Sequence, residues 1–457
     1  ADLYLQPASS TITGGTIEIG ASATSQVIDI NSIIPVYNVS VTGTTNTARL
    51  EFNGLTLRGS LNITAGNIFN ANSLNVNVAG NFTNSNTTST TGVGVGGYQA
   101  GSVSQTTTLN GSANHQNIAG VSGNLTNFGN LVISNTFTSG TVTLQATITN
   151  LRVNGTLTLS NGTLAGTDNT ITALSTISNS ATQTNTAGGS ITLAGSSSQF
   201  ITGNNTGKFG NVILNNASGA TFGANQEITG TLTFSSGSLT IGSFSLNMSN
   251  TSLTAIVNAS AARYIITSGN LSDGGLTKAF AASVTNGNFI YPLGVSGKYT
   301  PANYTITTGV IGGTITIRPV NSKHPNATGS GTAYINYYWS VSHSVILLSS
   351  LTHTYTYAAT DENGVIANYK DARFRSGAWT IDANGAGDDP NPNTTTRVIT
   401  FTNTDLAGDY TAGEPTAFVN PTTYTSIASG DWESDATVWD IDPPGTNLGP
   451  PTGSFVI

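Results

Sequence analysis

Short apolar runs with a period of two residues recur along the first part of the chain. Leu131 and Ile133 alternate with polar or small residues, and Val142 and Leu144 do the same. This period puts every second side chain on one face, as in a β-strand that is buried on one side. The runs span roughly three to six residues and are separated by Asn-Gly, Ser-Gly and Gly-Thr pairs, which favour tight turns. The pattern predicts an all-β protein built from short strands.

These runs belong to a longer sequence repeat. The segment NFGNLVISN at residues 127–135 matches KFGNVILNN at 208–216, and 81 residues separate Phe128 from Phe209. The segments on either side of the two copies match as well. Self-similarity on this scale is typical of stacked supersecondary units, which bury their apolar edges only against their neighbours.

Two architectures fit short strands with frequent turns, namely a parallel β-solenoid and a series of small sandwiches. Small residues and Asn at the turns favour the solenoid. We therefore expect a repetitive β-solenoid, similar to a parallel β-helix, over residues 1–255. Its units are expected at about 30–100, 105–175 and 190–255.

The amino-acid composition of the chain changes near residue 255. Longer aromatic runs and charged loops follow, and all four Trp residues lie beyond this point. The first 250 residues contain only six acidic and four basic side chains. The second half predicts an antiparallel β-sandwich over residues 256–420. Residues 421–457 are interpreted as the start of a further repeat module that is cut off.

The overall charge and composition exclude several classes of partner. The net charge is −8 and only 7% of residues are charged, so no basic patch is present for nucleic-acid phosphates. No run of about eighteen apolar residues occurs, which argues against membrane insertion. Cysteine is absent, which removes disulfides and thiolate metal sites.

Several short motifs recur in order along the chain. They are Gln116 to Gly120, Phe128 to Asn135 and Gly155 to Leu164, followed in the second half by Tyr291 to Gly294 and Ala412 to Glu414. In this arrangement the chain resembles the repetitive cell-surface and adhesin proteins of the Bacteroidetes, which the type IX secretion system exports. The resemblance implies an extracellular location at the cell surface and contact with secretion or anchoring machinery. No C-terminal sorting domain is recognisable, so we expect a part of a longer protein.

The sequence offers no catalytic group, and we expect no enzyme activity, cofactor or metal. Serine and threonine are too numerous for one nucleophile to stand out. His324, His343 and His353 have no spacing of a known zinc site, and we expect the last two on separate strands. The Asp382–Asp389 loop has oxygen ligands for calcium without a recognised spacing, so calcium binding stays open. The run from Tyr337 to Trp339 is expected to pack in a core.

The expected function is therefore structural or adhesive, as a stiff rod or fibre that contacts cell-surface or matrix components. One alternative is a glycan-binding or glycan-active extracellular protein. Another is a filament subunit that binds copies of itself by strand complementation through Leu3–Leu5 and Ser454–Ile457. Recognition energy concentrates in Trp, Tyr and Arg on loops. The candidate ligand-binding loop is accordingly the one with Tyr369, Arg373, Arg375 and Trp379.

Overall fold

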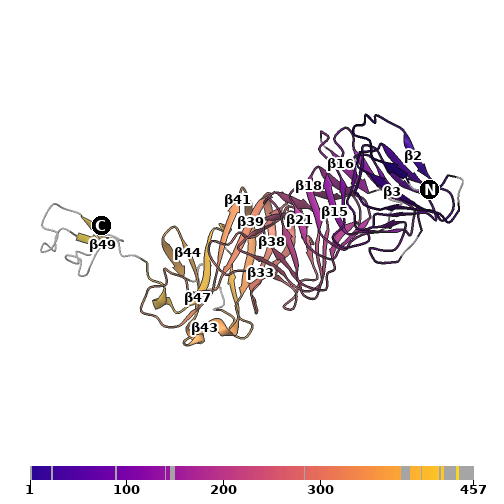
Figure 1. The fold of residues 1–457 in the computed structure, drawn as a ribbon. Helices are drawn as coiled ribbons and strands as arrows, with labels where there is room; N and C mark the ends of the chain where they lie inside the picture. The colour runs from indigo at the N-terminus through magenta and orange to yellow at the C-terminus, as the bar shows by residue number, and fades with distance from the viewer. Residues whose placement is uncertain are drawn as a thin grey trace.

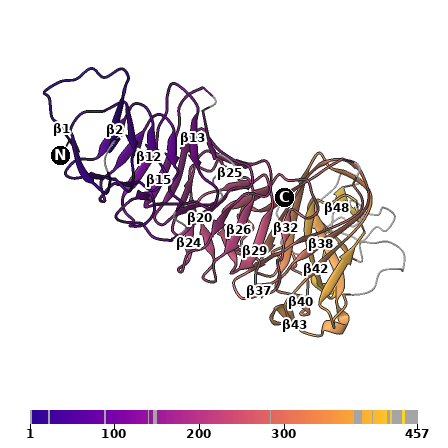
Figure 2. The same ribbon diagram turned by 90° about the vertical axis from the view of Figure 1, so that its right-hand side faces the viewer.

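The computed structural model describes residues 3–21, 24–87, 90–138, 140–144, 150–282, 284–381, 392–402, 404–420, 424–426 and 439–441. Strands make up nearly all of its regular structure, and the helices in these ranges are three single 3-10 turns. The chain winds into a parallel β-solenoid of about eleven turns, as expected. Figure 1 shows the turns stacked along one axis from β2 (Thr16–Ile19) and β3 (Val27–Ser32) towards β39 (Gly313–Val320) and β41 (Tyr338–Ser344), and Figure 2 shows the same stack turned by 90°.

Three sheets form the sides of the solenoid, and each turn contributes one strand to each. Sheet 1 contains, in order, β6 (Leu55–Leu57), β9 (Val76–Val78), β12 (Thr106–Leu109), β15 (Asn130–Ser134), β18 (Leu157–Asn161), β21 (Ile177–Asn179), β24 (Gln199–Thr202), β27 (Ala220–Phe222), β30 (Leu239–Gly242), β33 (Ile265–Thr267), β36 (Leu293–Val295) and the antiparallel β37 (Lys298–Tyr299).

Sheet 2 contains β2 (Thr16–Ile19), β4 (Asn38–Val41), β7 (Leu61–Ile63), β10 (Phe82–Asn84), β13 (Gln116–Gly120), β16 (Thr141–Leu144), β19 (Thr163–Gly166), β22 (Thr182–Asn185), β25 (Gly207–Phe209), β28 (Gln226–Ile228), β31 (Ser245–Met248) and β34 (Gly275–Phe280).

Sheet 3 has two stacks. They are β1 (Leu3–Leu5), β3 (Val27–Ser32), β5 (Thr47–Leu50), β8 (Ile68–Asn70) and β11 (Tyr98–Gln99), then β14 (Leu125–Phe128), β17 (Asn150–Val153), β20 (Thr170–Ala173), β23 (Ser190–Leu193), β26 (Val212–Asn215), β29 (Leu232–Ser236) and β32 (Ile256–Val257).

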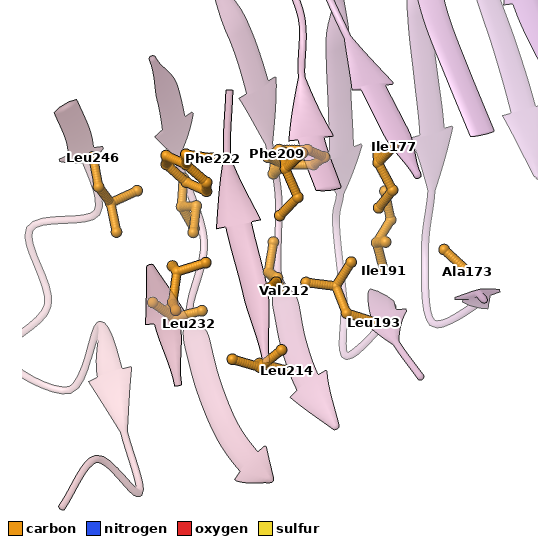
Figure 3. Packing of buried hydrophobic residues seen from close by; sticks show 14 of the residues in the cluster. Ala173, Ile177, Ile191, Leu193, Phe209, Val212, Leu214, Phe222, Leu232 and Leu246 are labelled. Carbon is orange, nitrogen blue, oxygen red and sulfur yellow. The ribbon is translucent and has the colours of Figure 1, made fainter. Parts of the chain in front are cut away.

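The two-residue period of the sequence sets the core. Along each strand the apolar side chains point into the solenoid and the alternate polar ones point outward. Figure 3 shows Ile177 of β21, Ile191 of β23 and Phe209 of β25 meeting inside. All three are buried, and similar side chains from neighbouring turns stack above and below them. A single apolar core therefore runs along the axis.

The sequence repeat does not return to the same side of the solenoid. Phe128 ends β14 on sheet 3, whereas its equivalent Phe209 ends β25 on sheet 2. Between them the chain advances by eleven strands, which is one strand short of four complete turns. Equivalent sequences thus occupy different faces, because all three faces present the same alternation of buried and exposed positions.

Buried amides hold the corners together in both copies. The Gln116 side-chain oxygen accepts hydrogen bonds from the Gly111 N–H (2.8 Å) and the Asn135 amide (3.0 Å). Its amide donates to two backbone carbonyls of the turn before, at 2.9 and 2.6 Å. Gln199 and Asn216 repeat this arrangement with one another and with the same kinds of backbone group. We call each set an amide clamp, and it satisfies backbone groups that the corner leaves without a ladder partner.

The parallel ladders continue beyond residue 255. β33 pairs in parallel with β30, β34 with β31, and β36 with β33. In sheets 1 and 2 the strand direction changes only afterwards, where β39 (Gly313–Val320) pairs antiparallel with β34 and β37 pairs antiparallel with β36. The change in composition therefore precedes the change in strand direction.

The expected antiparallel sandwich is seen in part. The first strands after residue 255 belong to the solenoid. Sheet 2 then extends through β39 and β41 (Tyr338–Ser344) to β47 (Gly408–Gly413), β44 (Lys370–Arg375), β45 (Ala378–Ile381), β40 (Tyr334–Ile335) and β43 (Glu362–Asn363). Sheet 4 is a separate antiparallel sheet of β35 (Thr285–Tyr291), β38 (Ala302–Ile311), β42 (Leu347–Thr356) and β46 (Val398–Phe401).

An aromatic core joins sheet 4 to the extended sheet 2. Tyr355 of β42 stacks on Tyr410 of β47, with ring centroids 5.1 Å apart, and Phe401 of β46 lies 4.8 Å from Tyr410. Trp339 of β41 packs 5.2 Å from Tyr355. These side chains belong to the same continuous cluster as the solenoid core. We call the antiparallel part, namely β35 and residues 296–420, the cap, because it closes the end of the parallel stack.

The remaining elements are short. The 3-10 turns span Ala359–Asp361, Ile366–Asn368 and Pro415–Ala417, and β48 (Tyr424–Ser426) pairs with β49 (Trp439–Ile441).

Candidate functional site

The predicted ligand-binding residues lie in and beside the β44–β45 hairpin of the cap. Tyr369 precedes β44 and is buried, and its hydroxyl lies 2.8 Å from the Tyr334 carbonyl and 2.9 Å from the Asn363 N–H. Burial raises the pKa of Tyr369 above its usual value. The side chain is thus committed to internal contacts.

The other predicted residues divide between core and surface. Arg373 is only 9% exposed, donates to the Ala407 carbonyl and lies over the Tyr410 ring. Trp379 is 4% exposed and its indole N–H donates to the Asn326 carbonyl at 2.9 Å. Arg375 is exposed and forms an ion pair with Asp405.

The structure therefore places Arg375 at the surface, and it places Tyr369, Arg373 and Trp379 in the protein interior and not on an exposed loop. They lie on or beside strands, and the hairpin carries them against a small second core of Ala327, Ala372, Trp379, Ala417 and Phe418. Large aromatic side chains stabilise a core as effectively as they stabilise an interface, so residue type alone did not distinguish the two roles.

Two buried histidines occupy the cap without forming a metal site. His324 Nε2 lies 3.0 Å from Asp409 Oδ2, and its Nδ1 accepts the Asn326 N–H at 3.1 Å. The accepted bond fixes the neutral tautomer with the proton on Nε2, which donates to the carboxylate. Tyr338, Phe374 and Trp379 enclose the ring. The pair thus anchors the rings of the second small core.

His353 lies in the aromatic core instead. Its Nδ1 is 2.9 Å from the Tyr355 hydroxyl, and its ring stacks on Tyr304 and Phe401. His343 and His353 lie on the separate strands β41 and β42, which confirms the prediction. Within the ranges that the structure describes, no group of three His, Asp or Glu side chains is placed to hold a metal ion. Residues 382–391, with the acidic loop, lie outside these ranges.

The aromatic run on β41 packs on both of its sides. Tyr337 and Trp339 are fully buried towards sheet 4, where the Trp339 indole donates to the Thr300 carbonyl at 3.0 Å. Tyr338 points the other way, to His324. The prediction that this run packs in a core is confirmed, and it removes these rings from any glycan-binding surface.

A buried lysine marks the junction between solenoid and cap, and sequence reasoning missed it. Lys278 of β34 is fully buried beside the last turn of the solenoid. Its ammonium donates to the Asn250 carbonyl at 2.7 Å and to the Ala279 carbonyl, and lies 4.8 Å from the centre of the Phe280 ring. Burial lowers its pKa to about 8. The sequence signal for its burial was its inward position in the period-two pattern of β34, between Leu276 and Phe280.

The outer faces of the solenoid carry few charges, and four of these form two ion pairs between turns. Arg49 Nε lies 2.7 Å from Asp29, and Lys208 Nζ lies 3.1 Å from Glu227, each one turn away. Elsewhere hydroxyl and amide side chains form rows across the ladders, such as Thr141, Thr163 and Thr182 on sheet 2. These rows supply hydrogen-bonding surface without acid–base chemistry.

Comparisons with known proteins give no relative from which these features could be interpreted. No protein-family model, curated protein or solved structure matches the chain. No helix within the described ranges is long and apolar enough to cross a membrane.

Proposed function

We propose that this protein is a structural, adhesive component of an extracellular surface, in which the solenoid serves as a stiff spacer. The observation that carries the proposal is the single core that passes from the solenoid into the cap, together with sheets 1 and 2, whose parallel ladders continue into antiparallel strands of the cap. Mutually stacked turns resist bending because each strand bonds to neighbours on both sides. An extended, weakly charged surface of hydroxyls and amides suits passive contact rather than catalysis.

The cap is a sandwich-like element that covers the C-terminal end of the solenoid. A parallel stack presents unpaired backbone groups at its last strand, and such an edge invites aggregation. In this chain β37 and β39 pair antiparallel with β36 and β34 and so cover two of the three sheets. The cap then acts as a joint to whatever module follows it, and not as an independent domain on a flexible linker.

Stiffness is tested in the 457-residue chain by distance measurement between spin labels. The chain has no cysteine, so Asn77→Cys on β9 and Thr240→Cys on β30 give two unique labels on the outer face of sheet 1. Seven turns separate the two strands, which corresponds to about 34 Å at about 4.8 Å a turn. A narrow distribution near this distance is expected.

A deletion provides the matched control. Leu157, Ile177 and Ile201 are successive partners on sheet 1, so removing residues 157–200 takes out two complete turns in register. The distance is expected to fall by about 10 Å and to stay narrow. A broad distribution in the unmodified chain would overturn the stiff-spacer proposal, and so would measurable cleavage of a polysaccharide by the purified protein.

A further inference from the structure

A polar groove crosses the corner between sheets 1 and 2 near the N-terminal end of the solenoid. The corners after β6 and β9 each have three residues, 58–60 and 79–81, whereas the corner after β12 has six, 110–115. Tyr37 lies on the turn before the short corners, and the longer loop lies on the turn after them. The groove between them has a volume of about 480 Å³, within the roughly 300–1,000 Å³ typical of ligand pockets.

Glycine backbone forms the floor of the groove. A Cβ atom on Gly59 would lie 2.9 Å from Cδ1 of the Tyr37 ring, and one on Gly80 would lie 2.5 Å from the Gly59 carbonyl carbon. Neither position has room for a side chain. The Tyr37 ring therefore lies against a flat backbone surface and is itself half-buried, which leaves part of the ring facing the groove.

The walls carry hydrogen-bond donors that the fold holds in place. Arg58 is exposed, and its guanidinium donates to the Ile12 carbonyl at 3.0 Å. His115 is exposed as well, and its Nδ1 accepts the Thr141 N–H at 3.1 Å, which leaves Nε2 to face a ligand. Asn81 Oδ1 accepts the Asn117 N–H at 2.9 Å, whereas the Asn81 NH2 group and the Tyr37 hydroxyl have no hydrogen-bond partner among the described residues.

The charge of the groove differs from that of the chain. Its lining includes the positively charged Arg58 and no Asp or Glu, although the whole chain has a net charge of −8. An anionic group is therefore favoured here and disfavoured over most of the remaining surface. Amides, hydroxyls and backbone dominate the lining, with no aliphatic pocket for a peptide side chain. These groups match the hydroxyls of a sugar ring.

We propose that this groove binds an acidic saccharide, that is, a pyranose bearing a carboxylate. The Tyr37 ring stacks on the face of the sugar, Arg58 and His115 hold the carboxylate, and the amide of Asn81 bonds a hydroxyl. The proposal goes beyond the spacer function, since a stiff rod without this affinity would still act as a spacer. It also moves the adhesive contact from the cap to the solenoid.

The test is calorimetric binding of the 457-residue chain to a galacturonic acid hexasaccharide, with cellohexaose and a hexaglutamate peptide as comparison ligands. Binding of the acidic sugar alone is expected. Arg58→Gln should weaken this binding at least tenfold, because it removes a charge-assisted hydrogen bond to the carboxylate. Arg152→Gln is the matched control, since Arg152 lies on sheet 3 and bonds Asn154, and it should change affinity less than twofold.

A second pair of variants separates stacking from folding. Tyr37→Phe keeps the ring and should retain affinity within about threefold, whereas Tyr37→Ala should lose about tenfold, with unchanged circular dichroism in both. Absence of binding to the acidic sugar overturns the proposal. Equal binding of cellohexaose or of hexaglutamate, or equal loss in the Arg58 and Arg152 variants, overturns it as well.

Discussion

The solenoid and the cap bury polar groups in different ways. In the solenoid the buried polar side chains are mainly Asn and Gln, and they bond to backbone at the corners, as Gln116 and Gln199 do. In the cap they include Tyr, His and Arg, and several bond to one another or stack. Solenoid turns are therefore held by local, repeated clamps, whereas the cap depends on a connected network of long-range aromatic contacts.

This difference predicts how far the destabilising effect of a substitution extends in each region. A lost clamp affects a corner and the turns beside it, because each turn contacts only its neighbours. A lost ring in the cap affects many partners, since Tyr355 alone packs against His353, Trp339, Phe401 and Tyr410. The comparison predicts a graded response in one region and a cooperative one in the other.

The largest effect is expected from Phe401→Ala in the cap. Phe401 is fully buried between His353 and Tyr410, and removing such a ring costs about 3–5 kcal/mol of the free energy of unfolding. All four Trp residues lie beyond residue 255, so Trp fluorescence during urea unfolding reports this region. Leu193→Ala in the solenoid is the control, and its main effect should be seen in far-UV circular dichroism. Equal shifts of the fluorescence transition would contradict the comparison.

The next effect concerns the amide clamps. Gln116→Ala and Gln199→Ala each leave a backbone N–H and two carbonyls of a corner unsatisfied, which costs about 2–3 kcal/mol. The two losses should agree within about 0.5 kcal/mol, although the clamps lie on different sheets, because the contacts are the same. Chemical denaturation measures both. A large difference between them would mean that the faces are not equivalent.

Lys278 provides a pH-dependent test of the junction. Its pKa in the folded protein is about 8, below its ordinary value of 10.5, so the unfolded chain binds the proton more tightly. Lys278 should therefore contribute a rise in the free energy of unfolding between pH 8 and 10, on the order of 2 kcal/mol. Buried tyrosines such as Tyr291, Tyr304 and Tyr355 oppose this contribution increasingly above about pH 9, because burial raises their pKa and only the unfolded chain then ionises.

Replacing this lysine isolates its contribution. Lys278→Met removes the charge at similar volume, so the rise between pH 8 and 10 should vanish and stability at pH 7 should increase. Lys208→Met, on the outer face, is the matched control and should keep the rise. Thermal unfolding across this pH range measures both variants. A rise that persists in Lys278→Met would exclude this side chain as its origin.

The smallest effect is expected on the outer face. Lys208 pairs with Glu227 across one turn and is largely solvent-exposed, so Lys208→Gln should cost less than about 1 kcal/mol. The effect should shrink further at high salt. Chemical denaturation at low and high salt measures it. A larger loss would show that cross-turn charges, and not the clamps, hold the stack.

The sequence by itself determined the local structure of the solenoid. Alternation such as Leu131 and Ile133 specifies both the strand and its inward face, and Asn and Gly mark the corners, because these properties depend only on neighbouring residues. The repeat that relates Phe128 to Phe209 indicated that similar units stack on one another. It did not reveal that the copies occupy different sheets, since the strands per turn are set by how corners fold in three dimensions.

Only the tertiary structure decided which polar and aromatic side chains are exposed. Trp379 and Arg373 are buried because another segment packs over the hairpin, and Lys278 is buried because the cap closes on the last turn. Conversely, Tyr37, Arg58 and His115 are distant in sequence and form one groove because successive turns place their corners side by side. Burial and proximity of this kind arise from contacts between distant segments, which a local pattern does not encode.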